Sequence, residues 1–276
     1  MRERLAPECY TGQMNVRRLL ALVGACGVAV VALTGCSAES GTAVTESSTT
    51  APSTTERTTT ATTTAVTETE TGSEPYRAET LLVSGSTDRV DYDVEIPQIS
   101  GGDPAVVDEF NESTRAALQD LIDGPGTERY TLSTGTHEVT RIGEHVVAGL
   151  LVTSYNMNPP GAHPTAIVST VAVNTDDATP ITLQDLFPDL QAGLDRLSEQ
   201  SALLLPETAA GPDYVAEGIA PEEINFANWL PTPEGMEIHF GDYQVGPHAI
   251  GLVTVTVPWD DLDDVMDPAI VPVVSS

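Results

Sequence analysis

The sequence of 276 residues contains no lysine: all 11 of its basic residues are arginines, against 41 aspartates and glutamates. The formal net charge is −30 at pH 7. Nucleic-acid-binding proteins neutralise phosphates with lysine and arginine, so this composition excludes nucleic acid as a partner. It permits a partner of positive charge, which an acidic surface attracts over long range. The alternative is a proteome in which acidic residues are abundant everywhere and mark no partner.

Cysteine is also scarce, since the sequence contains three, Cys9, Cys26 and Cys36. Three cysteines at these spacings supply neither a disulfide framework nor a zinc-binding cluster. If residues 1–35 are removed, as argued next, Cys36 is the only cysteine left. The folded part must then depend on its hydrophobic core, for which its length is sufficient.

The N-terminal segment has the layout of a bacterial lipoprotein signal. The arginine pair Arg17 and Arg18 precedes 15 apolar or small residues at 19–33, and residues 33–36 read Leu-Thr-Gly-Cys. A membrane-spanning helix needs about 20 apolar residues, whereas the apolar part of a cleaved signal needs about 7–15. The length therefore fits a cleaved signal.

We predict that residues 1–35 are removed and that lipid on the thiol of Cys36 anchors the protein to the cell membrane, outside the cytoplasm. Cleavage would leave 39 acidic residues and 7 arginines. Two alternatives stay open, namely a signal cleaved without lipidation and translation that starts at Met14.

Residues 36–75 are predicted to be a disordered linker. Threonine, serine, alanine and glutamate dominate this segment, and it shows no apolar periodicity. Such a composition cannot bury a core. The segment would act as a stalk of about 35 Å between lipid and domain. Its threonine and serine content would also suit O-glycosylation.

Apolar periodicity indicates a folded domain over residues 76–266. Residues 77–83 and 89–96 alternate as strands do. Asp103 and Pro104 then form a helix start, and the helix is expected to stop at Gly124. Its apolar stripe is expected at Val107, Phe110, Thr114, Ala117 and Leu121.

The C-terminal part of the domain continues the same mixture. We expect strands at 145–154, 165–173, 236–240 and 250–257, a helical turn from Leu183 to Phe187, a helix after Asp189 and a short helix at 260–265. His239 alternates with apolar residues, so its side chain is expected to face solvent.

Strand pairs interrupted by single helices predict an α+β fold, with a mostly antiparallel sheet and one or two packed helices. The domain would have an N-terminal half at about 76–142 and a C-terminal half at about 143–266. Residues 267–276 would form a C-terminal tail.

Motifs for catalysis and metal binding are missing from the sequence after Cys36. No G-x-S-x-G elbow and no H-E-x-x-H motif occurs there. The run of acids at 260–264 lacks the alternating ligands and central glycine of a calcium loop. We therefore predict no metal, no cofactor and no catalytic residue that sequence alone can name.

Three ordered segments resemble the extracellular domain family of the anti-sigma factor RsiV. They are Gly-Ala-His-Pro at 161–164, Ile-Thr-Leu-Gln-Asp-Leu-Phe at 181–187, and the stretch at 236–251. The paired strands and helix at 90–121 are similar to the N-terminal half found in RsiV and in the peptidoglycan deacetylase PdaC. Secreted mycobacterial immunogenic proteins look related too.

The resemblance implies a non-catalytic binding domain in the cell envelope. RsiV binds lysozyme, so the expected partner is a cationic protein such as lysozyme, or else a cell-wall glycan. Candidate binding loops contain Gly161, His163, Tyr243 and His248, and Gly161 is expected to permit a turn that a side chain would block. Two other functions stay open: a weak esterase that uses a serine with His163 or His248, and an inert structural or antigenic surface protein.

Overall fold

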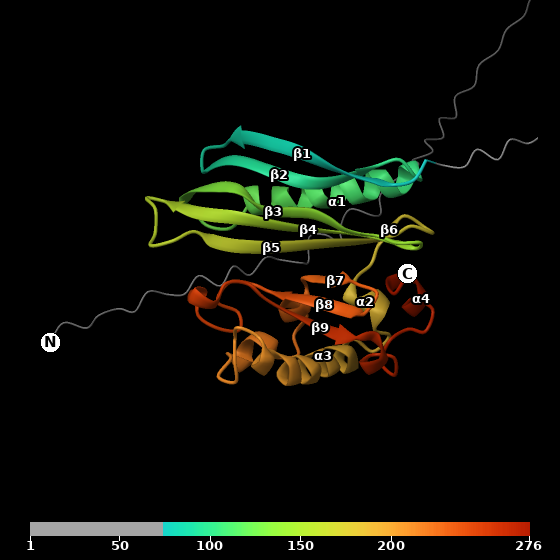
Figure 1. Ribbon diagram of the computed structural model, residues 1–276. Helices are drawn as coiled ribbons and strands as arrows, with labels where there is room; N and C mark the ends of the chain where they lie inside the picture. Colours follow the sequence, from blue (N-terminus) through green and yellow to red (C-terminus); the bar gives the residue numbers. More distant parts are fainter. Residues whose placement is uncertain (1–73) are drawn as a thin grey trace, which may run out of the picture. The chain divides into compact units, whose positions relative to one another are not determined.

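A six-stranded sheet in the order β1-β2-β3-β4-β5-β6 forms the larger layer of the fold in the computed structural model, which describes residues 74–276 (Figure 1). The predictions for the signal, for Cys36 and for the linker up to residue 73 lie outside the described residues. The sheet and its helix comprise β1 (Arg77–Ser86), β2 (Val90–Ser100), α1 (Pro104–Ile122), β3 (Arg129–Ile142), β4 (Val146–Asn158), β5 (Thr165–Asn174) and β6 (Thr179–Pro180).

The C-terminal part of the chain forms a second layer around a three-stranded sheet in the order β7-β8-β9. Its helices and strands are α2 (Leu183–Leu186), α3 (Leu190–Leu204), β7 (Trp229–Pro231), β8 (Gly235–Phe240), β9 (Val253–Pro258) and α4 (Val271–Val274). Short 3-10 turns connect them at Leu205–Glu207, Ala216–Ile219, Glu223–Phe226, His248–Ile250 and Trp259–Asp261. None of the described helices is long and apolar enough to cross a membrane.

All neighbouring strands pair antiparallel except β2 and β3. These two run parallel, with Val90 opposite Tyr130, because α1 carries the chain back along the sheet between them. The predicted α+β fold with a mostly antiparallel sheet is confirmed. The large sheet extends from residue 77 to 180 without a break at residue 142.

Helix α1 begins as the sequence predicts and buries a slightly different stripe. The side chain of Asp103 accepts a hydrogen bond from the backbone N–H of Ala105 at 2.8 Å, and Pro104 follows as the first helical residue. Val106 and Leu118 are buried in place of the predicted Val107 and Ala117. Because α1 packs against a broad sheet, it buries a stripe of side chains that is wider than one line of residues.

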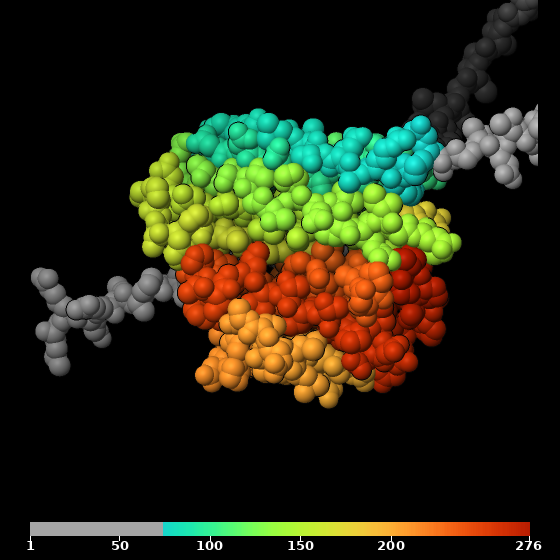
Figure 2. Space-filling view, viewed as in Figure 1, coloured from blue at the N-terminus to red at the C-terminus, as the bar shows by residue number. Residues whose placement is uncertain are grey.

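Strands β4 and β5 are covered on both faces. Val147 and Val173 pack with Phe110 of α1 on one face. Val146, Ala148 and Ala172 point to the other face and belong to the core of the C-terminal layer, the largest apolar cluster of the described residues. Figure 2 shows this layer, in orange and red, directly against the green strands of the large sheet.

Helices α2 and α3 cap the C-terminal layer through a short connection. Thr182 and Asp185 form a capping box at the start of α2, and the side chain of Asp189 accepts from the backbone N–H of Ala192 at the start of α3. Phe187 lies between the two helices and is 1% exposed. It packs against Gly193, where a side chain would overlap its ring.

Four local predictions for the C-terminal part of the chain differ from the structure. The last strand begins at Val253 because residues His248–Ile250 form a 3-10 turn, and a 3-10 turn at Trp259–Asp261 replaces the expected helix at 260–265. The side chain of His239 is 11% exposed and does not face solvent freely, since its Nε2 lies 2.8 Å from Glu237. Within residues 267–276, helix α4 buries Val274 in the core.

The contact between Gly193 and Phe187 makes a specific prediction. We expect Gly193→Ala to destabilise the fold by about 1–3 kcal/mol through overpacking. An unconstrained helix would instead gain up to about 1 kcal/mol from the same change. Urea denaturation at unchanged m-value measures the difference.

Ala192→Gly, at the neighbouring half-buried position of α3, is the matched control and should cost about 1 kcal/mol. Adding Phe187→Leu to Gly193→Ala should cost less than the sum of the single changes, because the two side chains share one space. A Gly193→Ala protein as stable as the wild type contradicts this packing.

Candidate functional site

Two loops far apart in the sequence bring three of the four predicted residues together. His163 lies in the loop between β4 and β5, whereas Tyr243 and His248 lie in the loop between β8 and β9. The imidazole rings of His163 and His248 stack with centroids 3.6 Å apart and planes 9° apart. The rings of Tyr243 and His248 have centroids 5.7 Å apart. We call His163, Tyr243 and His248 the ring cluster.

Hydrogen bonds fix the orientation of the rings. Nδ1 of His163 lies 3.1 Å from the carbonyl oxygen of Pro164, which can only accept, so this nitrogen donates. In the neutral ring Nε2 then accepts from the hydroxyl of Tyr243 at 3.0 Å. The hydroxyl of Tyr243 is thereby held against one loop while its backbone belongs to the other.

The backbone of Tyr243 is strained. Its φ is +65°, in the left-handed region that side chains other than glycine rarely adopt. The turn is closed by Gln244, whose Oε1 accepts from the N–H of Gly241 at 2.8 Å. The side chain is nevertheless 53% exposed, so burial of the ring does not compensate the strain. Strain held at an exposed aromatic residue is a feature of functional loops.

Asp242 is the buried partner of the cluster, and the sequence analysis missed it. Its side chain is 3% exposed, and its Oδ2 accepts from Nδ1 of His248 at 2.8 Å. Its Oδ1 is buried with no hydrogen-bond partner among the described residues. A buried carboxylate oxygen left in this state favours a donor or a cation beside it. Asp242 lies two residues after the end of β8 and directly before Tyr243, a loop position that could have indicated it.

The chemistry of the cluster can be compared with the esterase hypothesis. A carboxylate bonded to Nδ1 orients His248 and leaves Nε2 outward, as in a catalytic triad. In the part of the chain that the structure describes, however, the hydroxyl bonded to an imidazole of the cluster belongs to Tyr243, and it reaches His163 and not His248. No group of three potential metal ligands occurs among residues 74–276.

Gly161 lies in the same loop as His163, but its expected steric role is not found. A Cβ atom added there would meet only the carbonyl oxygen of His163, at an ordinary distance of 3.8 Å. Its φ is outside the positive range that would require glycine. The loop is open at this point, so a side chain would fit.

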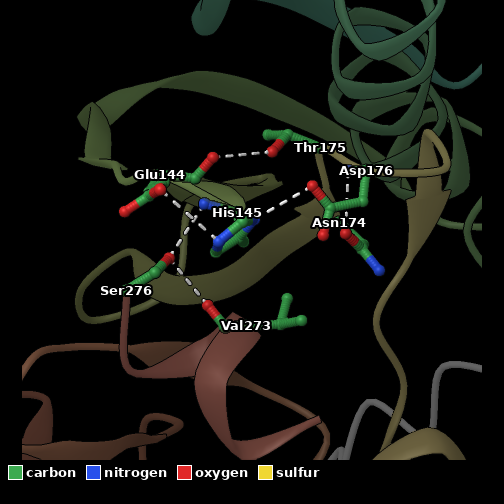
Figure 3. Close-up of polar contacts among 7 residues, drawn as sticks. All are labelled: Glu144, His145, Asn174, Thr175, Asp176, Val273 and Ser276. Carbon is green, nitrogen blue, oxygen red and sulfur yellow. Dashed lines mark hydrogen bonds and ion pairs between the residues drawn. The ribbon is translucent and has the colours of Figure 1, made fainter. Parts of the chain in front are cut away.

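Another histidine, His145, lies at the β3–β4 turn, in the polar network of Figure 3. Nδ1 of His145 is 2.9 Å from Asp176, and its Nε2 is 3.8 Å from Glu144. Ser276 accepts from the backbone N–H of His145 at 3.0 Å and donates to the carbonyl of Val273. Serine, histidine and acid therefore do meet here, but the serine hydroxyl bonds main-chain groups, which makes the network a clamp between loops.

Arginine is distributed unevenly along the described chain, whereas acidic residues occur throughout it. From Ile142 to the last residue there are 20 acidic residues and one arginine, Arg196. Arg196 is already paired, because its guanidinium donates two hydrogen bonds to the carboxylate of Asp264 at 2.7 and 2.9 Å. This pair lowers the pKa of Asp264. The second half of the domain therefore presents negative charge almost without compensation.

Comparison with known proteins bears on this same part of the chain. Residues 184–260 match the family described as a protein of unknown function, DUF3298. The DUF3298 segment contains Asp242, Tyr243 and His248 but not His163. It is shorter than the 76–266 span that the sequence analysis compared with RsiV. No curated protein matches the chain.

Two solved structures of DUF3298 proteins are similar. The protein from Bacteroides fragilis aligns with a TM-score of 0.46 at 14% identity, over 72% of this chain and 96% of its own. The protein from Pseudomonas aeruginosa aligns with a TM-score of 0.44 at 14% identity, over 71% of this chain and 95% of its own.

The His145 network makes the stability depend on pH. The hydrogen bond with Asp176, together with the charges of Asp176 and Glu144, raises the pKa of His145. The stabilisation is therefore complete below the unfolded pKa of about 6.5 and is lost as pH rises through the folded pKa. We expect Asp176→Asn to lower the free energy of unfolding more at about pH 5.5 than at about pH 8.5.

Denaturant unfolding of wild type and variant at both pH values checks this expectation. In a His145→Gln background the effect of Asp176→Asn should no longer change between the two pH values. An equal loss of stability at both pH values in the wild-type background would contradict the proposed ion pair.

Proposed function

We propose that this protein is a lipid-anchored binding domain that captures a cationic protein in the cell envelope, without catalysing a reaction. The observation that carries the proposal is the charge of the domain from residue 142 onward. This part contains 20 acidic residues and one arginine, which is itself paired with Asp264. DUF3298 is the domain found in RsiV-like proteins, and lysozyme, the ligand of RsiV, is a partner of the required charge.

Uncompensated negative charge acts in two ways on such a partner. It steers diffusing cations toward the surface and raises the association rate, an effect that falls with ionic strength. It also disfavours acidic proteins and nucleic acids by repulsion. Selectivity for a cationic class of ligands therefore needs no deep pocket.

The ring cluster supplies the local anchor in this proposal. The exposed ring of Tyr243 offers an electron-rich face to a lysine or arginine of the partner. The buried carboxylate of Asp242 holds the ring of His248 in place within the cluster and is not itself a contact surface for the partner. Aromatic residues in this kind of setting are the usual hot spots of protein interfaces.

Binding to hen lysozyme tests the proposal. We expect measurable affinity that weakens steeply when ionic strength rises from about 0.1 M to about 1 M, since the Debye length falls from about 10 Å to about 3 Å. Tyr243→Gly removes the ring and relieves the strained φ, so the fold should persist while the Kd rises about tenfold. Calorimetry or interferometry gives both numbers.

Asp176→Asn is the matched control, because it removes one aspartate of the other histidine–aspartate pair, outside the ring cluster. It should leave the Kd within about twofold. Binding of a cell-wall glycan and not of lysozyme would contradict capture of a cationic protein and identify the ligand as a sugar. Hydrolysis of short-chain esters that disappears in His248→Ala would overturn the non-catalytic role.

The anchor is tested separately on the intact protein in its bacterial host. Cys36→Ser removes the only thiol that can carry the lipid, so the protein should move from the membrane fraction to the soluble fraction. Mass spectrometry of the wild-type N-terminal peptide should show a lipidated Cys36. An unmodified thiol on a chain that still carries residues 1–35 contradicts the anchor.

A further inference from the structure

Strand β1 forms one edge of the large sheet and is open on its outer side. It pairs with β2 alone, and in the described part of the chain no strand lies beyond it. In Figure 2 its atoms form the margin of the molecule opposite the C-terminal layer. Leu82 is 55% exposed and Leu81 is 36% exposed. An unpaired edge of ten residues with exposed leucines is a template for another strand.

The other edge of the same sheet is protected. Strand β6 has only two residues, and one of them is Pro180, which cannot donate a ladder hydrogen bond. Strand β1 has no proline, and its charges, Arg77 and Glu79, lie at its beginning. The β6 edge of the sheet is therefore protected from pairing with another strand, whereas the β1 edge is free to pair.

A groove of about 490 Å³ runs along the face of β1 that points to α1. Leu81 and Val83 line it from the strand, and Leu118 and Ile122 line it from the helix. Arg115 also lines this groove, and its one recorded hydrogen bond goes to the carbonyl of Asn111 in its own helix. A groove lined by both apolar side chains and an exposed guanidinium fits an occupant that brings both a strand and a carboxylate.

Glu79 supplies that carboxylate in a second copy of the chain. Glu79 lies opposite Gln98, whose side chain bonds Thr114 of α1, so Glu79 points to the same face as the groove. If two β1 strands pair antiparallel about Leu81, Glu79 of the second copy stands opposite Val83 of the first. Arg115 lies in the groove beside Val83. Two-fold symmetry makes the same contact twice.

We infer that the protein forms a homodimer through its β1 strands, antiparallel about Leu81, which joins two six-stranded sheets into one. The exposed leucines are covered, and each Arg115 meets the Glu79 of the other copy. This interface lies at the edge of the sheet away from the C-terminal layer, so it is independent of the proposed binding function.

Sedimentation velocity of the purified protein over a concentration series tests the inference. The wild type should reach twice the monomer mass. Arg115→Glu and Glu79→Arg should each weaken the dimer about tenfold, because each reversal places two like-charged contacts at the interface. The double variant restores both pairs with their signs exchanged and should regain most of the wild-type affinity.

Glu112→Arg is the matched control, since it makes the same change of charge as Glu79→Arg. Glu112 lies on the exposed side of α1 and does not line the groove. It should leave the dimer within about twofold of the wild type. Circular dichroism and urea midpoints of all variants separate weakened association from unfolding.

A wild type that stays monomeric at every concentration overturns the inference. The inference also fails if hydrogen exchange finds the outward amides of β1, those not bonded to β2, protected in the monomer, since another segment then covers the edge. A dimer that neither single reversal weakens overturns it as well, because its interface then lies elsewhere.

Discussion

Burial of β4 and β5 on both faces is the constraint on which the rest of the structure depends. Helix α1 covers one face through Phe110, and the C-terminal layer covers the other through Val146, Ala148 and Ala172. A hydrogen bond from the N–H of Trp229 to the hydroxyl of Thr170 ties β7 to β5 at 3.1 Å. Because these strands hold both layers, they also fix the loop after β4, and with it His163, relative to the loop after β8.

The covered strands leave the outer part of the large sheet free. Strands β1 and β2 lie at the side of the sheet away from the C-terminal layer (Figure 1), and every residue of β1 except Val83 is exposed. The fold thus places the open edge of β1 and the ring cluster on different surfaces. The ring cluster belongs to the part of the chain after residue 142, which contains one arginine, whereas five of the six described arginines lie before residue 142. Two kinds of contact can be made without competing for one surface.

Much of the fold could be predicted from local signals. Asp103 and Pro104 mark a helix start by chemistry that acts within a few residues, and so does Asp189. The core stripe of α1 differs at two positions, Val106 and Leu118, because the width of the facing sheet, which no local pattern encodes, decides which side chains are covered. The prediction for His239 was wrong because alternation gives the face of the strand but not how far that face is exposed to solvent.

The candidate site was predictable only in part. A motif resemblance pointed to His163, Tyr243 and His248, which are separated by up to 85 residues, and only the tertiary fold places their rings in contact. The buried state of Asp242 could not be read from a chain in which acids are abundant. The parallel pairing of β2 and β3 was missed as well, since it depends on where α1 returns the chain.

The left-handed backbone at Tyr243 has a consequence for the thermodynamics of recognition. In the proposed binding function, a loop already held by Gln244 and by the stacked imidazoles would have little rotational freedom left to lose when a partner binds. The conformational entropy was lost during folding, so association carries a smaller entropic penalty. Rigid loops of this kind also bind without an induced-fit step, which leaves the encounter rate to diffusion and charge.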